Sequence, residues 1–255
     1  MSLILTPLHN IPIVHTGDDL VEMIWDGLSQ ASLILQEGDI LVLAQKIVSK
    51  AEGRWINLVS VQPSARAVEL AEKIEKDPRL VELVLRESNQ ILRTRVGTII
   101  VEHRLGFVCA NAGIDHSNVA GEGNSTEEWV LLLPENPDGS SNLIRQKLEG
   151  RSGVHLGVMI IDSHGRAWRQ GVVGVSIGLS GLPGLVDMRG KNDLFGYNLR
   201  STTIGVADEL AAAASLVMGQ ANEGTPIVHV RDFPYKLRDG NLKELIRPKE
   251  QDLFR

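Results

Sequence analysis

Two short segments carry the oxygen-bearing side chains whose types and spacing suit a metal-dependent reaction. In the first, Asp115 and Asn118 stand three residues apart in the glycine-containing stretch NAGIDHSN. Carboxylate and amide oxygens are ligands that Mg²⁺ and Mn²⁺ prefer. The competing interpretation is an Asx-turn, in which Asp115 binds the backbone of its own loop, and the residue types alone favour that turn.

The second segment is Asp162 with Ser163, which directly follow the apolar run HLGVMII. A carboxylate at the carboxyl end of a buried strand is well placed to hold a metal at the rim of a sheet, and Ser163 adds a hydroxyl oxygen. The sequence Asp-Ser-His-Gly is equally typical of a turn, so both interpretations stay open.

Cationic side chains and one polar loop could complete a phosphate-handling site. Arg166 and Arg169 flank the same predicted turn as Asp162, and Lys50 lies on the polar segment after an apolar strand. Cations beside oxygen-ligated metals neutralise charge on transferring phosphoryl groups, whereas ordinary solvated surface charge is the alternative. The loop MGQANEG follows a predicted helix and offers an amide oxygen at Gln220 and backbone amides for an anion, against an ordinary helix end.

The chain lacks the common catalytic and nucleotide-binding signatures. It has no GxxxxGK[ST] loop, no GxGxxG opening a helix and no GxSxG nucleophile elbow, and its seven histidines form no HxxxH pair. The single cysteine, Cys109, excludes an intramolecular disulfide and is expected to be a small buried hydrophobe. A net charge of −6 and an aromatic content of 4% argue against a dedicated nucleic-acid binder.

The elements that must position these residues are strands and helices without a regular alternation. The patterns predict strands at 3–6, 40–44, 99–101, 106–110, 130–133, 155–161 and 227–230, and helices at 18–35, 64–76, 77–88, 142–149 and 206–218. Turns are expected at 137–140 and 162–166, a polar connection at 45–53, and tight sheet packing in the glycine-rich stretch 171–184. The predicted fold class is α+β, with mixed or antiparallel sheets and flanking helices in one body over residues 1–255.

The N-terminus has neither a basic segment nor a long apolar core, and no membrane-spanning apolar run is present. A cytoplasmic protein is therefore expected.

Six blocks, taken in order and spacing, resemble one family. They are QKIVSKAEG, NAGIDHSN, LPENPDGS, IIDSHGRAWRQGVVGVSIGLSG, GKNDLFG and MGQANEGTP. The set resembles the coenzyme F420 gamma-glutamyl ligases, the CofE-type enzymes also found as the N-terminal half of the FbiB proteins. The resemblance extends from residue 5 to about residue 238, and no C-terminal nitroreductase-like domain is expected.

The resemblance implies a GTP-dependent ligase. Such an enzyme joins the amine of L-glutamate to the lactyl carboxylate of the deazaflavin precursor F420-0, or its dehydro form, then adds further glutamates through gamma links, and releases GDP and phosphate. The resemblance also implies Mg²⁺ or Mn²⁺ with two ions per site, K⁺ as an activator, and an intertwined homodimer of CofE-like fold.

The resemblance assigns site residues as well. Asp115 and Asp162 would hold one metal, and Ser163 and Gln220 would help to hold a second. Nucleotide contacts would come from His9, Asn10, Ile11, Pro12, Ala44, Gln45, Lys50, Asn118, Met218, Gly219, Gln220, Ala221, Asn222, Glu223, Gly224 and Thr225. Arg166 and Arg169 join Asp115 and Asp162 as catalytic candidates on charge grounds alone.

Two other function classes use the same residues. One is a metal-dependent nucleotide phosphohydrolase or a nucleotide-binding regulatory protein, and the other is a purely structural assembly protein. A ligase differs from both because its nucleotide turnover depends on its two other substrates.

Overall fold

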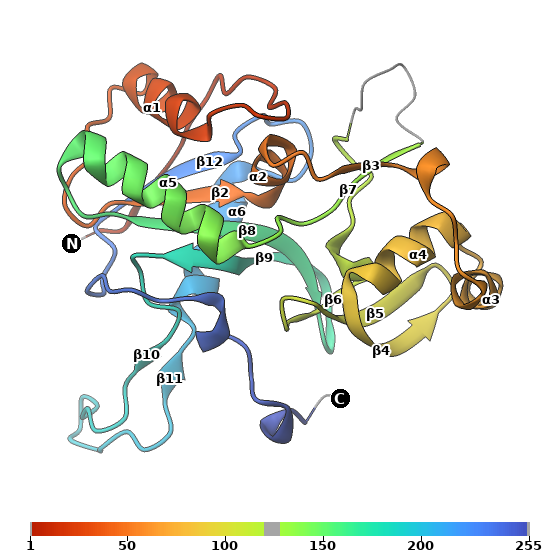
Figure 1. Ribbon diagram of the computed structural model, residues 1–255. Coiled ribbons are helices and arrows are strands. Elements are labelled where there is room, and N and C mark those ends of the chain that lie inside the picture. The colour runs from red at the N-terminus through yellow and green to blue at the C-terminus, as the bar shows by residue number, and fades with distance from the viewer. Residues whose placement is uncertain (1, 120–127, 254–255) are drawn as a thin grey trace.

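A five-stranded sheet runs through the larger part of the molecule (Figure 1). The computed structural model describes residues 2–119 and 128–253. In spatial order, the strands are β1 (Ile4–Pro7), β12 (Ile227–Arg231), β2 (Ile40–Ala44), β8 (Gly157–Arg166) and β9 (Arg169–Ser180). β2 and β8 run parallel, and the other neighbouring pairs of this sheet are antiparallel. The predicted mixed α+β class is confirmed.

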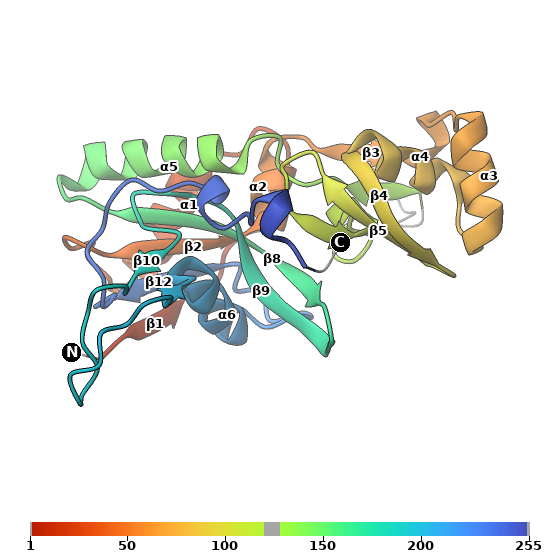
Figure 2. The same ribbon diagram turned by 90° about the horizontal axis from the view of Figure 1, so that it is seen from below.

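Helices cover both faces of this sheet (Figure 2). They are α1 (Leu20–Gln30) and α5 (Pro137–Ser152) on one face and α6 (Val206–Met218) on the other. In β2, Leu41 and Leu43 pack toward α1 and α5, while Ile40 and Val42 pack toward α6. Successive side chains of a strand point to opposite faces, so a strand covered on both faces must be apolar throughout.

A smaller group of elements extends from one end of the sheet, on the right in Figure 1. It contains β3 (Trp55–Asn57), η1 (Leu58–Ser60), α3 (Ala65–Ile74), α4 (Pro78–Arg86), β4 (Ser88–Arg95), β5 (Thr98–His103), β6 (Val108–Ala110), η2 (Asn111–Gly113) and β7 (Trp129–Leu131). α3 and α4 pack on the β4–β5–β6 sheet around their own apolar core, and β3 pairs with β7.

The other connections complete the fold. α2 (Gln45–Ala51) follows β2, a projecting arm begins with β10 (Val186–Asp187) and returns with β11 (Thr203–Ile204), and the C-terminal segment contains η3 (Leu242–Glu244) and η4 (Lys249–Gln251). Among the described residues, no helix combines the length and apolar character needed to cross a membrane.

Three predicted helix starts are confirmed by their capping bonds. The Asp19 carboxylate accepts the Val21 amide at 2.9 Å, and the Asp77 carboxylate accepts the Arg79 amide at 2.8 Å. Ser64 caps α3 in the same way. These side chains satisfy amides that have no partner within the helix, which is why Asp and Ser are favoured there.

Three local predictions were wrong. The segment 45–53 was expected to be a polar connection, but residues 45–51 form α2. The expected turn at 137–140 is the first turn of α5, because Pro137 fits the N1 position and the Asn136 side chain caps the Gly139 amide. The expected turn at 162–166 is strand, because pairing with β9 continues to Arg166. β4 had not been predicted.

The glycines of β9 serve close packing, as predicted. A side chain at Gly174 would overlap the backbone of α6 at Ala211, and one at Gly178 would overlap Pro137 at the start of α5. Without a side chain, both helices can approach the edge strand directly. These contacts bring the start of α5 and the middle of α6 against β9, which pairs with the strand that carries Asp162.

A buried charge cluster at the far end of β2 predicts a large stability effect. Asp39 is 1% exposed; its carboxylate lies 2.8 Å from His229 Nε2 and accepts Arg231 Nη2 at 2.7 Å. Removing one partner of a buried ion pair leaves the other charge uncompensated, so Asp39→Ala is expected to lower the free energy of unfolding by about 3–5 kcal/mol in urea denaturation. The matched control is Asp187→Ala, whose pair with Arg189 is exposed to solvent and is expected to contribute little to stability.

The same carboxylate predicts a pH dependence of stability. Burial opposes ionisation of Asp39, but the His229 and Arg231 hydrogen bonds outweigh it and lower its pKa to about 2. The stabilisation is therefore present above the ordinary pKa of 3.8 and is lost as pH falls toward 2. Asp39→Ala should remove this part of the acid dependence; an unchanged acid profile would contradict the assignment.

Candidate functional site

A cavity of about 340 Å³ lies at the carboxyl end of β2, beside the middle of its parallel neighbour β8. Its walls come from the segment after β1, from the start of α2, from the middle of β8 and from the loop between α6 and β12. The polar residues lining it include Gln45, Lys46, Lys50, Asn118, Asp162, Ser163, Ser215, Gln220, Asn222, Glu223 and Thr225. Ligands in open α/β sheets favour this edge because the chain leaves each strand there.

Asp115 does not line this cavity itself, but it contacts two residues in the first turn of α2, Gln45 and Lys46, that do. The Gln45 amide donates to Asp115 Oδ2, and Lys46 Nζ lies 3.0 Å from Asp115 Oδ1. Ser49 Oγ donates to Gln45 Oε1 at 2.9 Å and thereby fixes which end of the amide faces Asp115. Both carboxylate oxygens of Asp115 contact side chains of α2 and not the loop that carries Asp115. The side chain therefore connects the segment around residue 115 to the start of α2.

Burial raises the pKa of Asp115 above its ordinary value. The Lys46 ammonium opposes this shift, while the nearby negative charge of Asp162 adds to it. The two carboxylates are thus close enough to repel each other, and a cation between them would relieve that repulsion.

Asp162 and Ser163 point to opposite faces of β8 and reach different partners. Asp162 Oδ2 lies 3.1 Å from His164 Nε2, two residues along the same face. Ser163 Oγ donates to Gln220 Oε1 at 2.9 Å, which joins β8 to the loop after α6. Burial raises the pKa of Asp162, but the His164 hydrogen bond and charge outweigh it and leave the pKa below its ordinary value.

The loop after α6 is fastened at both ends. Asn118 Nδ2 donates to the Ala221 carbonyl at 3.1 Å, and Thr225 Oγ1 donates to the Met218 carbonyl at 3.0 Å. Within the loop, the Glu223 carboxylate accepts the Ala221 amide at 2.8 Å. These bonds hold the loop as a wall of the cavity, with Asn118 crossing from the segment that carries Asp115.

Most residues predicted to bind nucleotide line this one cavity. They are Ile11, Pro12, Ala44, Gln45, Lys50, Asn118 and the run from Met218 to Thr225. His9 and Asn10 are exposed residues just before the lining segment. Arg166 and Arg169 lie near the exposed end of the β8–β9 hairpin, outside the lining, where Arg166 Nη2 donates to the Gln170 carbonyl. The roles of all these residues, including those that line the cavity, stay predictions.

The chain resembles proteins of a single family over nearly its whole length. The sequence profile of the family described as F420-0:gamma-glutamyl ligase matches residues 9–232. The chain belongs to this family. Three relatives are each described as coenzyme F420:L-glutamate ligase. The protein of Methanothermobacter thermautotrophicus is 48% identical over the full length of both chains. That of Methanopyrus kandleri is 47% identical over 95% of this chain and 93% of the relative. That of Methanocaldococcus jannaschii is 42% identical over 96% and 94%.

In this member of the F420-0:gamma-glutamyl ligase family, the predicted metal ligands have the donor atoms that a hard divalent cation binds. The predicted ligands offer two carboxylates, a hydroxyl and an amide oxygen, and Mg²⁺ and Mn²⁺ prefer oxygen donors. The Ser163 and Gln220 oxygens are 2.9 Å apart, and Asp115 and Asp162 interact electrostatically. Across the described residues, no group of three or more His, Cys, Asp or Glu side chains gathers as a metal site, and the predicted set contains only two such residues, Asp115 and Asp162.

Two polar contacts of the site were missed from the sequence. Lys46, which pairs with Asp115, went unnoticed because residues 45–51 were not recognised as a helix. As a helix, this segment places Lys46 and Lys50 one turn apart on one face, beside the cavity. The contact of His164 with Asp162 was missed because a turn was predicted at 162–166, whereas in a strand residues two apart lie on the same face.

Proposed function

We propose that this chain is a GTP-dependent ligase that joins L-glutamate to the lactyl carboxylate of coenzyme F420-0. Its family and its relatives' names support the ligation. The observation that carries the site assignment is the meeting of Asp115 and Asp162, from distant parts of the chain, beside the cavity lined by most of the predicted nucleotide contacts.

The chemistry follows from the poor reactivity of a free carboxylate. The acceptor carboxylate attacks the γ-phosphorus of GTP, so an oxygen–phosphorus bond forms and the bond to GDP breaks. The amine of glutamate then attacks the acyl carbon of the resulting acyl phosphate, and phosphate leaves. No nucleophilic side chain of the protein takes part.

The protein binds and orients the reactants in this scheme. Divalent ions held by Asp115, Asp162, Ser163 and Gln220 would offset the negative charge of the phosphates. Lys50 lines the same cavity and adds a positive charge beside the phosphates. The loop after α6 supplies backbone amides for phosphate oxygens.

An isotope experiment tests the acyl-phosphate step. The acceptor is labelled with ¹⁸O in its lactyl carboxylate and converted with GTP and glutamate. Because the leaving phosphate keeps the bridging oxygen, one ¹⁸O should appear in the released phosphate. Phosphate without label, formed together with ligated product, would exclude this intermediate.

Coupling of nucleotide turnover separates a ligase from a phosphohydrolase or a regulatory protein. GDP release should require both glutamate and the acceptor. Equal GDP release without either substrate would favour the phosphohydrolase. The homodimer, the K⁺ requirement, the number of glutamates added and the cytoplasmic location stay predictions from the family resemblance and the sequence.

A further inference from the structure

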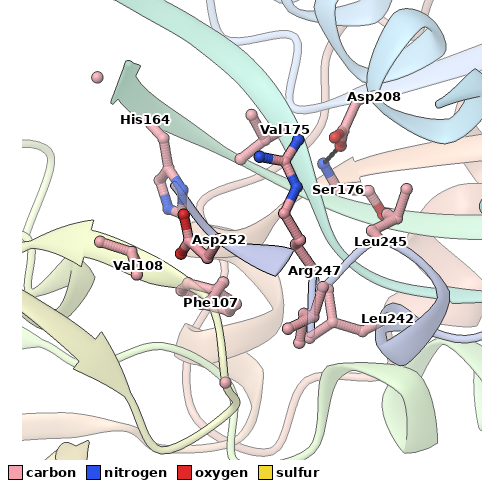
Figure 3. A pocket seen from close by; sticks show the side chains of 13 residues that line it. Phe107, Val108, His164, Val175, Ser176, Asp208, Leu242, Leu245, Arg247 and Asp252 are labelled. Carbon is pink, nitrogen blue, oxygen red and sulfur yellow. Dashed lines mark hydrogen bonds between the residues drawn. The ribbon is translucent and has the colours of Figure 1, made fainter. Parts of the chain in front are cut away.

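A second cavity, of about 260 Å³, is lined by His164, which follows Asp162 of the first cavity by two residues along β8 (Figure 3). It is enclosed by the β8–β9 hairpin, the start of α6, the β5–β6 connection and the C-terminal segment. The residues that matter here are Phe107, His164, Ser176, Asp208 and Arg247. None of them belongs to the predicted nucleotide or metal set.

Ser176 gives this cavity an unused polar group. The residue is 5% exposed, and its Oγ has no hydrogen-bond partner among the described residues. Its backbone amide donates to Asp208 Oδ1 at 3.0 Å, and this bond holds the Asp208 carboxylate next to residue 176 (Figure 3). A buried hydroxyl without a partner is unfavourable, and a ligand that hydrogen-bonds it would remove that penalty.

The lining carries charges of both signs, from the carboxylates of Asp208 and Asp252 and the guanidinium of Arg247. Burial raises the pKa of Asp208, so its ionised form gains from a cationic partner. Arg247 brings a guanidinium, which binds carboxylates with paired hydrogen bonds. An ammonium and a carboxylate on one small molecule would match these two side chains.

The cavity adjoins the reacting groups. Ser176 pairs with Ile161 across the hairpin, directly beside the Asp162 pair with Val175. His164 lines the cavity and also contacts Asp162 at 3.1 Å. A molecule bound in this cavity would therefore lie close to Asp162, one of the predicted metal ligands.

We propose that this cavity binds the L-glutamate co-substrate, with its amino group on Asp208 and Ser176 Oγ and its α-carboxylate on Arg247; the ammonium gives one proton to the Asp208 carboxylate before the amine attacks. The inference rests on the ligase function proposed above. That reaction has three substrates, and the nucleotide cavity accommodates one of them. The volume lies just below the roughly 300–1,000 Å³ of pockets for drug-sized ligands, which suits an amino acid and not the larger deazaflavin acceptor.

The test is steady-state ligation by Ser176→Ala and Asp208→Asn, with each substrate varied in turn. The KM for glutamate should rise by about tenfold or more, as expected when a hydrogen bond to a charged group is lost, while the KM for GTP stays within about twofold. Ser141→Ala is the matched control, because Ser141 Oγ is also buried without a partner but lies outside the cavity. Asp77→Asn is the second control, because Asp77 also accepts a backbone amide.

Three results would overturn the proposal. They are an unchanged KM for glutamate in both variants, an equal rise of that KM in the controls, and a rise in the KM for the acceptor alone. If the wild-type chain forms no product, the ligase function fails, and calorimetric titration with L-glutamate tests the cavity separately. Binding by the wild type that is lost in Ser176→Ala and Asp208→Asn supports the site, and absence of binding overturns it.

Discussion

Asp162→Asn is expected to lower kcat/KM for ligation by about 10²–10³-fold, the loss seen when one preorganised electrostatic partner of a transition state is removed. Asn has nearly the same shape as Asp, so the strand pairing of β8 and β9 around this position should persist. The change removes one negative charge, and with it the strongest oxygen ligand that β8 offers. The drop should appear in activity and in Mn²⁺ affinity, while circular dichroism stays unchanged.

The control for this variant is Asp26→Asn on the exposed side of α1. It removes the same charge far from the cavity and should leave ligation within about twofold, as surface substitutions generally do. Asp162→Asn with more than half of the wild-type activity would remove Asp162 from the site.

Asp115→Asn is expected to lower kcat/KM by a similar factor of about 10²–10³, and Lys46→Met by about 10–100-fold. Lys46 acts through Asp115, because its ammonium lies 3.0 Å from Asp115 Oδ1 and fixes that carboxylate toward the cavity. The effects of residues in direct contact do not add. The double variant should therefore be no slower than Asp115→Asn alone.

A double-mutant cycle on kcat/KM measures this coupling. Full additivity would show that Lys46 acts independently of Asp115, by contact with a substrate for example. Lys147→Met serves as the control, because Lys147 pairs with Asp19 in a solvent-exposed position.

The same pair sets the direction of a pH effect. Burial raises the pKa of Asp115, and Lys46 opposes that shift. The active form is the ionised carboxylate, so activity at subsaturating Mn²⁺ should fall as pH falls, starting above the range of an ordinary Asp. Lys46→Met removes the opposing charge and should move this acidic limb to higher pH; a shift to lower pH would contradict the assignment.

The sequence predicts the chemistry of the site better than its geometry. Carboxylate, hydroxyl and amide side chains were recognisable because their types and local spacing suit a hard cation, and the apolar strands because burial on both faces requires it. The contact between Asp115 and α2 joins residues about seventy positions apart, and no local pattern encodes it.

Two of the three wrong local predictions share one cause. The segment 45–51 is polar, yet it becomes a helix because it packs between the sheet and the β3–β7 pair. Asp-Ser-His-Gly suits a turn, yet it stays extended because β9 offers a continuous partner. In both places, tertiary contacts outweigh local preference. The second cavity could not be predicted, because Ser176, Asp208 and Arg247 meet only in the folded chain.

The most direct test of the proposed ligation is mass spectrometry of the acceptor after incubation with the protein, GTP, Mn²⁺ and L-glutamate. The account predicts an acceptor heavier by one or more glutamyl residues, with one GDP released for each residue added and no product when GTP is omitted. GDP formed in the presence of all substrates, with the mass of the acceptor unchanged, would contradict it.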